Sequence, residues 1–261
     1  MQSVIEQLFG VAGKSVLVTG GSRGIGKAIA EAFVKAGARV YICSRDAEKC
    51  DAAARDLQQF GTCVSLPCNI ASAEDRQRLV RQLKEHETAL NVLINNAGAI
   101  WAAPLEEYPE SGWDKVFDLN VKGTFFLVKD LVALLSAGGS AEDPARIINV
   151  GSIDGFHVPG HETYAYSSSK AALHHLTRHF ASQLAARHVT ANIIAPGVFP
   201  SKMLAATLET KGMDAMVEPV PLKRLTGDSD MAGAAIYLAS KAGAYVTGAV
   251  IPVDGGMATT L

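Results

Sequence analysis

Short apolar runs alternate with longer segments of helical periodicity from one end of the chain to the other. The runs that predict strands are residues 15–18, 39–43, 62–66, 92–94, 147–150, 190–194 and 249–253. The segments that predict helices are residues 24–35, 46–60, 73–85, 111–135, 164–186 and 228–239. This alternation is typical of βαβ units, and strands that are apolar throughout indicate a parallel sheet with helices on both faces. We expect an α/β fold: one domain over residues 1–261, built on a Rossmann-like doubly wound sheet of about seven strands.

Two stretches interrupt the alternation. Residues 136–144 are small, polar and rich in glycine, which predicts an exposed loop. Residues 196–221 form a long, mostly irregular span with four prolines and only a short helical piece. Because long irregular segments inside a compact domain are usually functional lids or disordered, we expect residues 196–221 to form a substrate lid.

Composition narrows the class of protein. The chain has 261 residues, 48% of them hydrophobic, and a formal net charge of -2, so no basic field favours nucleic acid as a partner. Charged residues make up only 19%, which suits a protein that buries surface in an oligomer. The first ten residues do not resemble a secretory signal, and no apolar run is long enough to span a membrane. We expect a cytoplasmic protein with no membrane partner.

Candidate metal ligands are few. Cys43, Cys50, Cys63 and Cys68 form no C-x-x-C pair, which favours reduced thiols over a disulfide framework or a zinc site. His175 and His179 lie four apart on a predicted helix, next to His174, and could form a metal pair. No acidic or cysteine cluster accompanies them, so packing or interface histidines are favoured and no catalytic metal is expected.

A glycine-rich turn follows the first predicted strand. Its sequence runs from Thr19 to Gly26 as T-G-G-S-R-G-I-G and leads directly into a predicted helix. Glycines let the backbone approach a pyrophosphate, whose charge is stabilised by free N–H groups at the helix N-terminus. An ordinary strand–helix turn is the alternative, but the position at the start of the chain favours a dinucleotide site.

The end of the second predicted strand indicates which dinucleotide binds. An NAD site usually places an acid there to bind the ribose 2′-OH. Here the chain reads Cys43-Ser44-Arg45, without an acid at the first two positions. Arg45 and Arg23 could clamp a 2′-phosphate, although either could instead be a solvated surface residue. Asp46 follows and could cap the next helix. The pattern favours NADPH over NADH.

Tyr166 and Lys170 lie four apart in a helical pattern and therefore share one face. A cation beside a tyrosine stabilises the phenolate, so we expect Lys170 to lower the pKa of Tyr166 and make it a proton donor. Ser152 follows a predicted strand at its carboxyl end, where open α/β sheets bind ligands, and could donate to a carbonyl oxygen.

These motifs together resemble the short-chain dehydrogenase/reductase family over nearly the whole chain. The matching elements are the glycine-rich turn, Asn95-Asn96-Ala97-Gly98, Asn120-Val121 after Trp113-Asp114, Ser152, the Y-x-x-x-K of Tyr166 and Lys170, Pro196-Gly197 and Asp254-Gly255-Gly256. The resemblance implies a catalytic tetrad of Asn120, Ser152, Tyr166 and Lys170. Tyr166 would be the acid/base, Lys170 would also bind the nicotinamide ribose, Ser152 would orient the carbonyl, and Asn120 would hold a water that relays protons.

The turn, the strand ends and the resemblance together give a set of expected cofactor contacts. They are Gly20, Ser22, Arg23, Gly24, Ile25, Gly26, Ser44, Arg45, Asn69, Ile70, Asn96, Ala97, Gly98, Tyr166, Lys170, Pro196, Gly197, Phe199 and Ser201. Ser201 stands where the family often has a threonine that touches the nicotinamide amide.

The chain departs from the family pattern in three places. Ser152 and Tyr166 are 14 residues apart, one more than usual, which enlarges the substrate loop. Asn69 stands where the family usually has an aspartate near the adenine; it keeps an acceptor oxygen for the adenine amino group but lacks the negative charge. Tyr164 could be mistaken for the acid/base, but it lies six residues from Lys170 and does not share its helix face.

Within the family, three stretches look most like 3-oxoacyl-(acyl carrier protein) reductases, in particular the variant associated with rhamnolipid producers. That likeness implies a ketone reductase acting on a 3-oxoacyl thioester carried on acyl carrier protein or coenzyme A, and a homotetramer. Expected substrate contacts are Trp101, Ile153, Phe156, His157 and Met203, with His161 also well placed. Loop packing is an equal alternative for these residues. A dehydrogenase working in the oxidative direction and a non-catalytic NADPH-binding protein are the competing functions.

Overall fold

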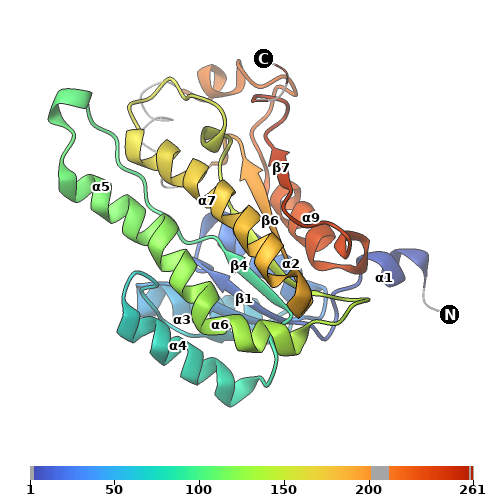
Figure 1. Cartoon of the computed structure of the whole chain (residues 1–261). Helices are drawn as coiled ribbons and strands as arrows, with labels where there is room; N and C mark the ends of the chain where they lie inside the picture. The colour runs from blue at the N-terminus through green and yellow to red at the C-terminus, as the bar shows by residue number, and fades with distance from the viewer. Residues whose placement is uncertain (1–2, 201–211, 259, 261) are drawn as a thin grey trace.

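The computed structural model describes residues 3–200, 212–258 and 260 of the chain. Within them, seven parallel strands form one sheet in the order β3-β2-β1-β4-β5-β6-β7 (Figure 1). The strands are β1 Ser15–Thr19, β2 Arg39–Cys43, β3 Cys63–Ser65, β4 Val92–Asn95, β5 Ala145–Val150, β6 Val189–Pro196 and β7 Val250–Val253. The order reverses between β1 and β4, which confirms the doubly wound sheet and marks the point where such sheets bind ligands.

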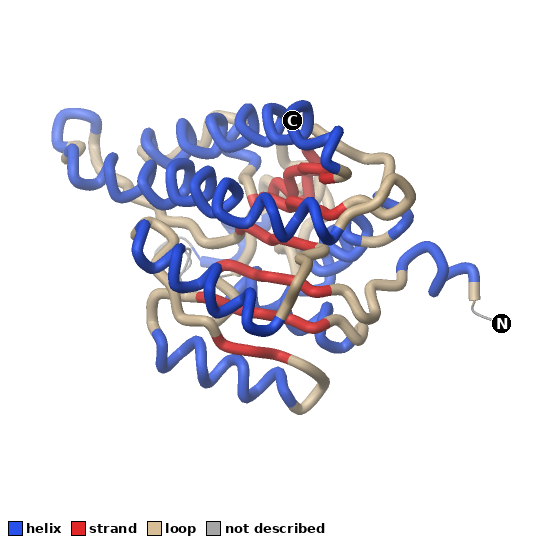
Figure 2. The backbone as a smooth tube through the Cα atoms, turned by 60° about the horizontal axis from the view of Figure 1, so that its bottom comes forward, coloured by secondary structure: helices blue, strands red, loops and turns tan. Residues whose placement is uncertain are grey.

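Helices cover both faces of the sheet (Figure 2). One hydrophobic core lies under α2 Gly24–Lys35, α3 Ala47–Gln58 and α9 Asp228–Ala239, and the other lies under α4 Ala73–His86, α6 Thr124–Gly138 and α7 Tyr164–Leu184. In Figure 1, α6 and α7 cross in front of the sheet. Five of the six predicted helices are therefore present, with ends shifted by at most two residues. Buried strand faces on both sides explain why the strands read as continuous apolar runs.

The sixth predicted helix, residues 111–135, is wrong as a single α-helix. The structure divides this region into α5 Glu110–Phe117, a π-helical turn η2 Asp118–Gly123, and α6. A Cβ at Gly123 would lie 2.9 Å from the carbonyl oxygen of Ile70, so the wide turn approaches the neighbouring loop at a residue without a side chain. The π turn directs Asn120 into the protein, where the residue is 1% exposed.

Several short elements were not predicted. The helix α1 Val4–Phe9 begins with a capping box formed by Ser3 and Glu6, and none of its residues is buried. The described residues also contain four 3₁₀ turns that join longer elements: η1 Leu105–Glu107, η3 Ile153–Gly155, η4 Ala185–Arg187 and η5 Lys241–Gly243. By contrast, the helical residues 212–217 agree with the short helical piece predicted inside the lid segment. No helix in the described part of the chain is long and apolar enough to cross a membrane.

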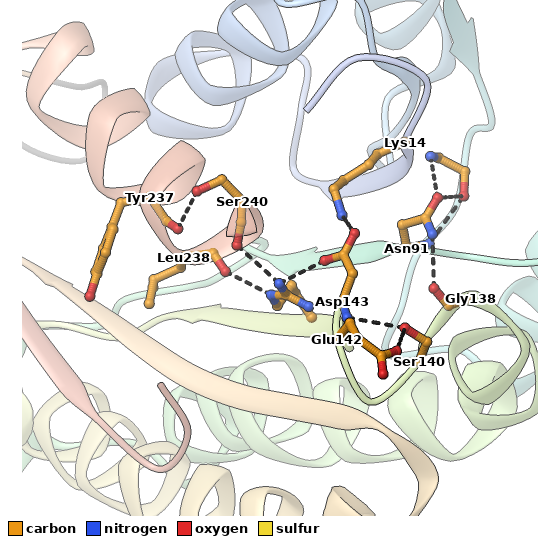
Figure 3. A network of polar contacts seen from close by, with 11 residues as sticks. Lys14, Asn91, Gly138, Ser140, Glu142, Asp143, Tyr237, Leu238 and Ser240 are labelled. Atoms are coloured by element: carbon orange, nitrogen blue, oxygen red, sulfur yellow. Dashed lines mark hydrogen bonds and ion pairs between the residues drawn. The ribbon is translucent and has the colours of Figure 1, made fainter. Parts of the chain in front are cut away.

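The amino-terminal edge of the sheet is held by a polar network (Figure 3). Arg146, at the start of β5, is 1% exposed and donates to the carbonyl oxygens of Leu238 and Ser240, both at 3.0 Å. Its guanidinium also donates to Asp143, whose second oxygen accepts from Lys14. Since the two carbonyls belong to the end of α9, a buried cation completes the hydrogen bonds of that helix terminus. Asp143 belongs to the predicted exposed loop, and its side chain bonds that loop to the buried Arg146.

Candidate active site

A cleft of about 1680 Å³ opens at the carboxyl ends of the strands. Residues from the loops after β1, β2, β3, β4, β5 and β6 line it, so the cleft runs across the point where the strand order reverses. Each strand contributes a few side chains to one edge, and that convergence brings together residues far apart in sequence.

The glycine-rich turn forms one wall of the cleft. Gly20 has a φ of +66°, and a Cβ on Gly26 would lie 2.4 Å from the Gly20 carbonyl oxygen, so both positions need glycine for α2 to pack directly on the end of β1. The cap residue of α2, Arg23, makes no side-chain hydrogen bond to the first turn. The N-terminus of α2 is therefore available to bind an anion.

Beside this turn the cleft is positively charged. Arg23 and Arg45 line it, and neither guanidinium is hydrogen-bonded to another residue that the structure describes. Lys49 also lines this end and was not singled out in the sequence. Asp46 accepts from the backbone N of Lys49 and pairs with its side chain, and that hydrogen bond lowers the pKa of the Asp46 carboxyl. Asp46 caps α3 as expected, and the two arginines remain for a ligand phosphate.

The N-N-A-G segment joins β4 to β1 at the floor of the cleft. The Thr19 hydroxyl accepts from the backbone N of Asn96 and of Ala97, both at 3.0 Å, and the Asn96 amide donates to the Thr19 carbonyl. Asn96, Ala97 and Gly98 line the cleft, as do Ser22, Ser44, Ile70 and Ile25 nearby.

Asn69 lies differently from the expectation. Its side-chain oxygen accepts from the backbone N of Ala71 at 3.3 Å, and the residue is not among those that line the cleft. Its neighbours Cys68 and Ile70 do line the cleft. The structure thus turns the Asn69 amide toward its own loop rather than toward an adenine site.

Three members of the implied tetrad meet on the cleft wall. Tyr166 and Lys170 come from the first two turns of α7, and Ser152 follows β5. The Lys170 Nζ donates to the Val150 carbonyl oxygen at 2.8 Å and lies 5.5 Å from the centre of the Tyr166 ring. The Ser152 hydroxyl lies close enough to Tyr166 to lower the pKa of the phenol. A ketone placed against this wall would meet two hydroxyls and an ammonium group.

The fourth member, Asn120, lies behind the wall rather than on it. Its side chain exchanges two hydrogen bonds with the backbone of Ala99, at 2.8 and 2.9 Å, and donates to the Ser169 hydroxyl. A Cβ on Gly98 would lie 3.4 Å from the Asn120 Oδ1 and 3.8 Å from the Lys170 Nζ. Only a glycine separates Asn120 from Lys170, and the predicted water relay between them stays a prediction.

The pKa of Tyr166 is raised overall, not lowered, although no separate effect of Lys170 on it is resolved. Burial, together with the charge of Asp154, raises the pKa of Tyr166 to about 12, and the nearby Ser152 hydroxyl opposes that change. Burial also lowers the pKa of Lys170 to about 8, and Asp154 opposes that change. The physical reason is that removing both groups from water disfavours their charged forms. Tyr166 is consequently a fully protonated donor at neutral pH.

Of the expected substrate contacts, Ile153 and His157 line the cleft, as do Phe199 and His161. Trp101 packs instead against α5, with its ring under Lys115 and against Gly112, and Phe156 is 47% exposed beside His174. Neither of these aromatic residues lines the cleft. Ser201 and Met203 lie outside the described residues. Asp154, Ile100, Met216 and Met257 line the cleft and were missed, although Asp154 comes just two residues after Ser152.

The other residues singled out in the sequence are three histidines of α7 and Tyr164. His174 is buried against Gly151 and Gly155, and burial lowers its pKa to about 4. His175 and His179 are exposed neighbours with ring centres 5.1 Å apart. The Tyr164 hydroxyl donates to Glu162 at 3.2 Å, so Tyr164 is not placed to act on a ligand with Lys170.

The doubly wound sheet, the uncapped helix at the glycine-rich turn and the Tyr166–Lys170–Ser152 arrangement define a dinucleotide-dependent oxidoreductase. The chain belongs to the short-chain dehydrogenase/reductase family. A family model described as "Enoyl-(Acyl carrier protein) reductase" matches residues 20–258.

Two curated relatives illustrate the range within the family. The rhamnolipids biosynthesis 3-oxoacyl-[acyl-carrier-protein] reductase of Pseudomonas aeruginosa is 47% identical over 249 residues, covering 95% of this chain and 97% of the relative. The 5-keto-D-gluconate 5-reductase of Escherichia coli is 33% identical over 256 residues, covering 97% and 98%. A solved structure, the Pseudomonas aeruginosa RhlG/NADP active-site complex, has a TM-score of 0.93 and 46% identity, and covers 97% of this chain and 99% of that chain.

Proposed function

We propose that this protein is an NADPH-dependent carbonyl reductase that reduces a 3-oxoacyl thioester to the 3-hydroxy compound. The observation that carries the proposal is the meeting of Tyr166, Lys170 and Ser152 at one end of the cleft, with Arg23 and Arg45 at the other. The names of the relatives support both parts, since one is a 3-oxoacyl reductase and the related solved structure holds NADP.

The cleft residues fit an NADPH molecule. The N-terminus of α2 would bind the pyrophosphate. Arg23 and Arg45, whose guanidinium groups form no hydrogen bond or ion pair with the described residues, would bind the 2′-phosphate. Lys170 would hold the nicotinamide ribose beside Tyr166. When bound, NADPH supplies the hydride that reduces the carbonyl carbon.

The protein supplies the proton and its placement. Ser152 donates to the carbonyl oxygen and fixes the ketone against the wall, and Tyr166 transfers its proton to that oxygen as negative charge develops there. An alkoxide is more basic than a phenolate, so the transfer is favourable even with the pKa of Tyr166 at about 12. The reverse reaction needs Tyr166 as a base, which is scarce at neutral pH. Tyr166 is thus in the protonated form that reduction requires.

A substrate panel tests the function. We expect NADPH consumption with S-acetoacetyl-N-acetylcysteamine, little with the matching trans-2-enoyl thioester, and little NADP⁺ reduction with the 3-hydroxy thioester at pH 7. Comparison with 5-keto-D-gluconate distinguishes the activities of the two relatives named above. Turnover of the enoyl thioester but not of the 3-oxo thioester would contradict carbonyl reduction, and no NADPH oxidation with any ketone would support a non-catalytic role.

We also propose that the chain works as a single domain, in the cytoplasm, and as a homotetramer, with the acyl group delivered on acyl carrier protein or coenzyme A. Apolar side chains exposed on the helices of one face support self-association, among them Trp113 at 41% and Phe125 at 40%. Sedimentation velocity over a concentration series checks the assembly state, and a monomer at micromolar concentration would exclude the tetramer.

A further inference from the structure

Asp154 occupies an unusual place for a carboxylate. It belongs to the turn η3, two residues after Ser152, and its backbone N donates to the Ser152 hydroxyl at 3.2 Å. The residue is partly buried and lines the cleft together with Ser152 and Tyr166. A carboxylate therefore lies on the same short stretch of wall as the two hydroxyls that would meet a ketone oxygen.

The other acidic residues that line the cleft have bonded partners. Asp46 pairs with Lys49, and Glu162 accepts from the Tyr164 hydroxyl. No hydrogen bond or ion pair joins the carboxylate of Asp154 to any residue that the structure describes. A carboxylate that lines the cleft and has no hydrogen-bonded protein partner is available to a ligand beside the reacting groups.

The charge of Asp154 reaches the reacting groups. It raises the pKa of Tyr166 and opposes the lowering of the Lys170 pKa, while His157, His161 and Lys170 counter the effect of burial on its own pKa. The groups that face it are thus His157 and His161 from its own loop and Tyr166 and Lys170 from α7, with His174 one turn beyond. Without Asp154, the ammonium of Lys170 would be the dominant charge at this end and would attract anionic ketones.

We propose that Asp154 is a specificity-determining residue that selects 3-oxo compounds without charge near the ketone, such as thioesters, over the corresponding 3-oxo acids. The inference rests on the proposed carbonyl reductase function and adds a residue that sets its substrate class. A substrate carboxylate would meet a like charge in a partly desolvated place, whereas a neutral thioester would not. An N–H or O–H group near the ketone would gain a charge-assisted hydrogen bond.

A matched pair of substrates isolates the effect of charge. S-acetoacetyl-N-acetylcysteamine and acetoacetate share the 3-oxo group and differ in the charge beside it. We expect Asp154→Asn to raise kcat/KM for acetoacetate relative to the thioester by about tenfold at pH 8, the scale of one like-charge contact at partial burial. The hydrogen bond from the backbone N of residue 154 to Ser152 does not involve the carboxylate and persists in this variant. Because damage to the site would lower kcat/KM, a rise in kcat/KM for acetoacetate above the wild-type value reports the loss of charge.

Glu162→Gln is the matched control, since it removes the same charge from the same loop at a carboxylate that already has a partner. We expect its substrate ratio to stay within threefold of wild type; an equal shift in both variants would mean that overall charge selects the substrate and would overturn the assignment to Asp154. If Asp154→Asn does not fold, Asp154→Ser takes its place in the same comparison.

A second readout is the pH profile of thioester reduction. Because Asp154 supports the charged form of Lys170, its loss moves the alkaline limb to lower pH. If a folded Asp154→Asn enzyme keeps the wild-type ratio of kcat/KM for the two substrates and the wild-type alkaline limb, the role of Asp154 is refuted while the proposed function stands. Failure of the wild type to reduce the thioester would instead refute the proposed function.

Discussion

The two edges of the sheet use polar side chains in opposite ways. At the amino-terminal edge, Lys14 and Arg146 both donate to Asp143, and Arg146 also donates to the end of α9 (Figure 3). At the carboxyl edge, Arg45 and Asp154 have no hydrogen-bonded or ion-paired partner among the described residues. The first edge fixes the fold, whereas the second retains groups that can bind a ligand.

The contrast teaches how to find a site in a fold of this kind. Charge alone does not distinguish the edges, because the amino-terminal network contains two cations and an anion. The distinction is whether the polar atoms already have protein partners, since groups at a cleft without such partners remain available to a ligand. Substitutions at the two edges should therefore separate catalysis from stability.

The largest expected effect is at Tyr166. Tyr166→Phe removes the proton donor and keeps the ring, so we expect kcat for 3-oxo thioester reduction to fall about 1000-fold. Binding of NADPH, followed by fluorescence, and the thermal midpoint should stay close to wild type. A variant that retains the wild-type rate would show that another group delivers the proton.

At Arg146 we expect a loss of stability without a loss of activity. Arg146→Met leaves the two carbonyl oxygens at the end of α9 without their donor, and we expect the free energy of unfolding in urea to fall by about 2 kcal/mol. The kcat and KM of the folded enzyme should be unchanged. Lys14→Met, which removes a cation that pairs with the half-exposed Asp143, serves as the control and should cost less than about 1 kcal/mol. Equal losses in the two variants would contradict the role given to the buried guanidinium.

A smaller effect is expected at Arg45. Arg45→Ala removes one of the two guanidinium groups near the proposed 2′-phosphate, and we expect the NADPH/NADH ratio of kcat/KM to fall about tenfold. The thermal midpoint should not change, since this side chain bonds to no described residue. An unchanged cofactor ratio would move the phosphate contact to Arg23 or Lys49.

The smallest effect is the pH dependence of the wild-type enzyme. The pKa of Lys170 is lowered to about 8, so its charged form is complete below that pH and is lost above it. Tyr166 stays protonated over the same range, because burial raises its pKa to about 12. We expect kcat/KM for reduction to be flat from pH 6 to 7.5 and to decline above pH 8. A flat profile up to pH 10 would exclude a requirement for charged Lys170.

The sequence predicted the strands well because strands buried on both faces leave an unbroken apolar signal. It did not predict the π turn, since residues 118–123 keep a helical apolar pattern although their hydrogen bonding changes. It missed α1, whose apolar residues are all exposed and belong to no core. Backbone motifs such as the glycine-rich turn were informative because spacing alone defines them.

Side-chain direction was harder to predict. Trp101 and Asn69 lie at expected positions along the chain but turn toward α5 and toward their own loop. Sequence position does not determine such choices, because they depend on the hydrogen bonds and space that neighbouring elements offer. The low acidity of Tyr166 was missed for a related reason, since burial is a property of the folded chain.

The wide turn at Asp118–Gly123 makes chain length at this point a constraint of its own. Deleting one residue here would let α5 and α6 join as one regular helix, at little local cost. Because a π turn holds one residue more than an α turn for nearly the same rotation, α6 would still bury Leu127 and Leu131 against the sheet. The loss would fall on Asn120, whose direction into the protein depends on the extra residue, so a relative one residue shorter here could keep the core and lose this contact behind the catalytic wall.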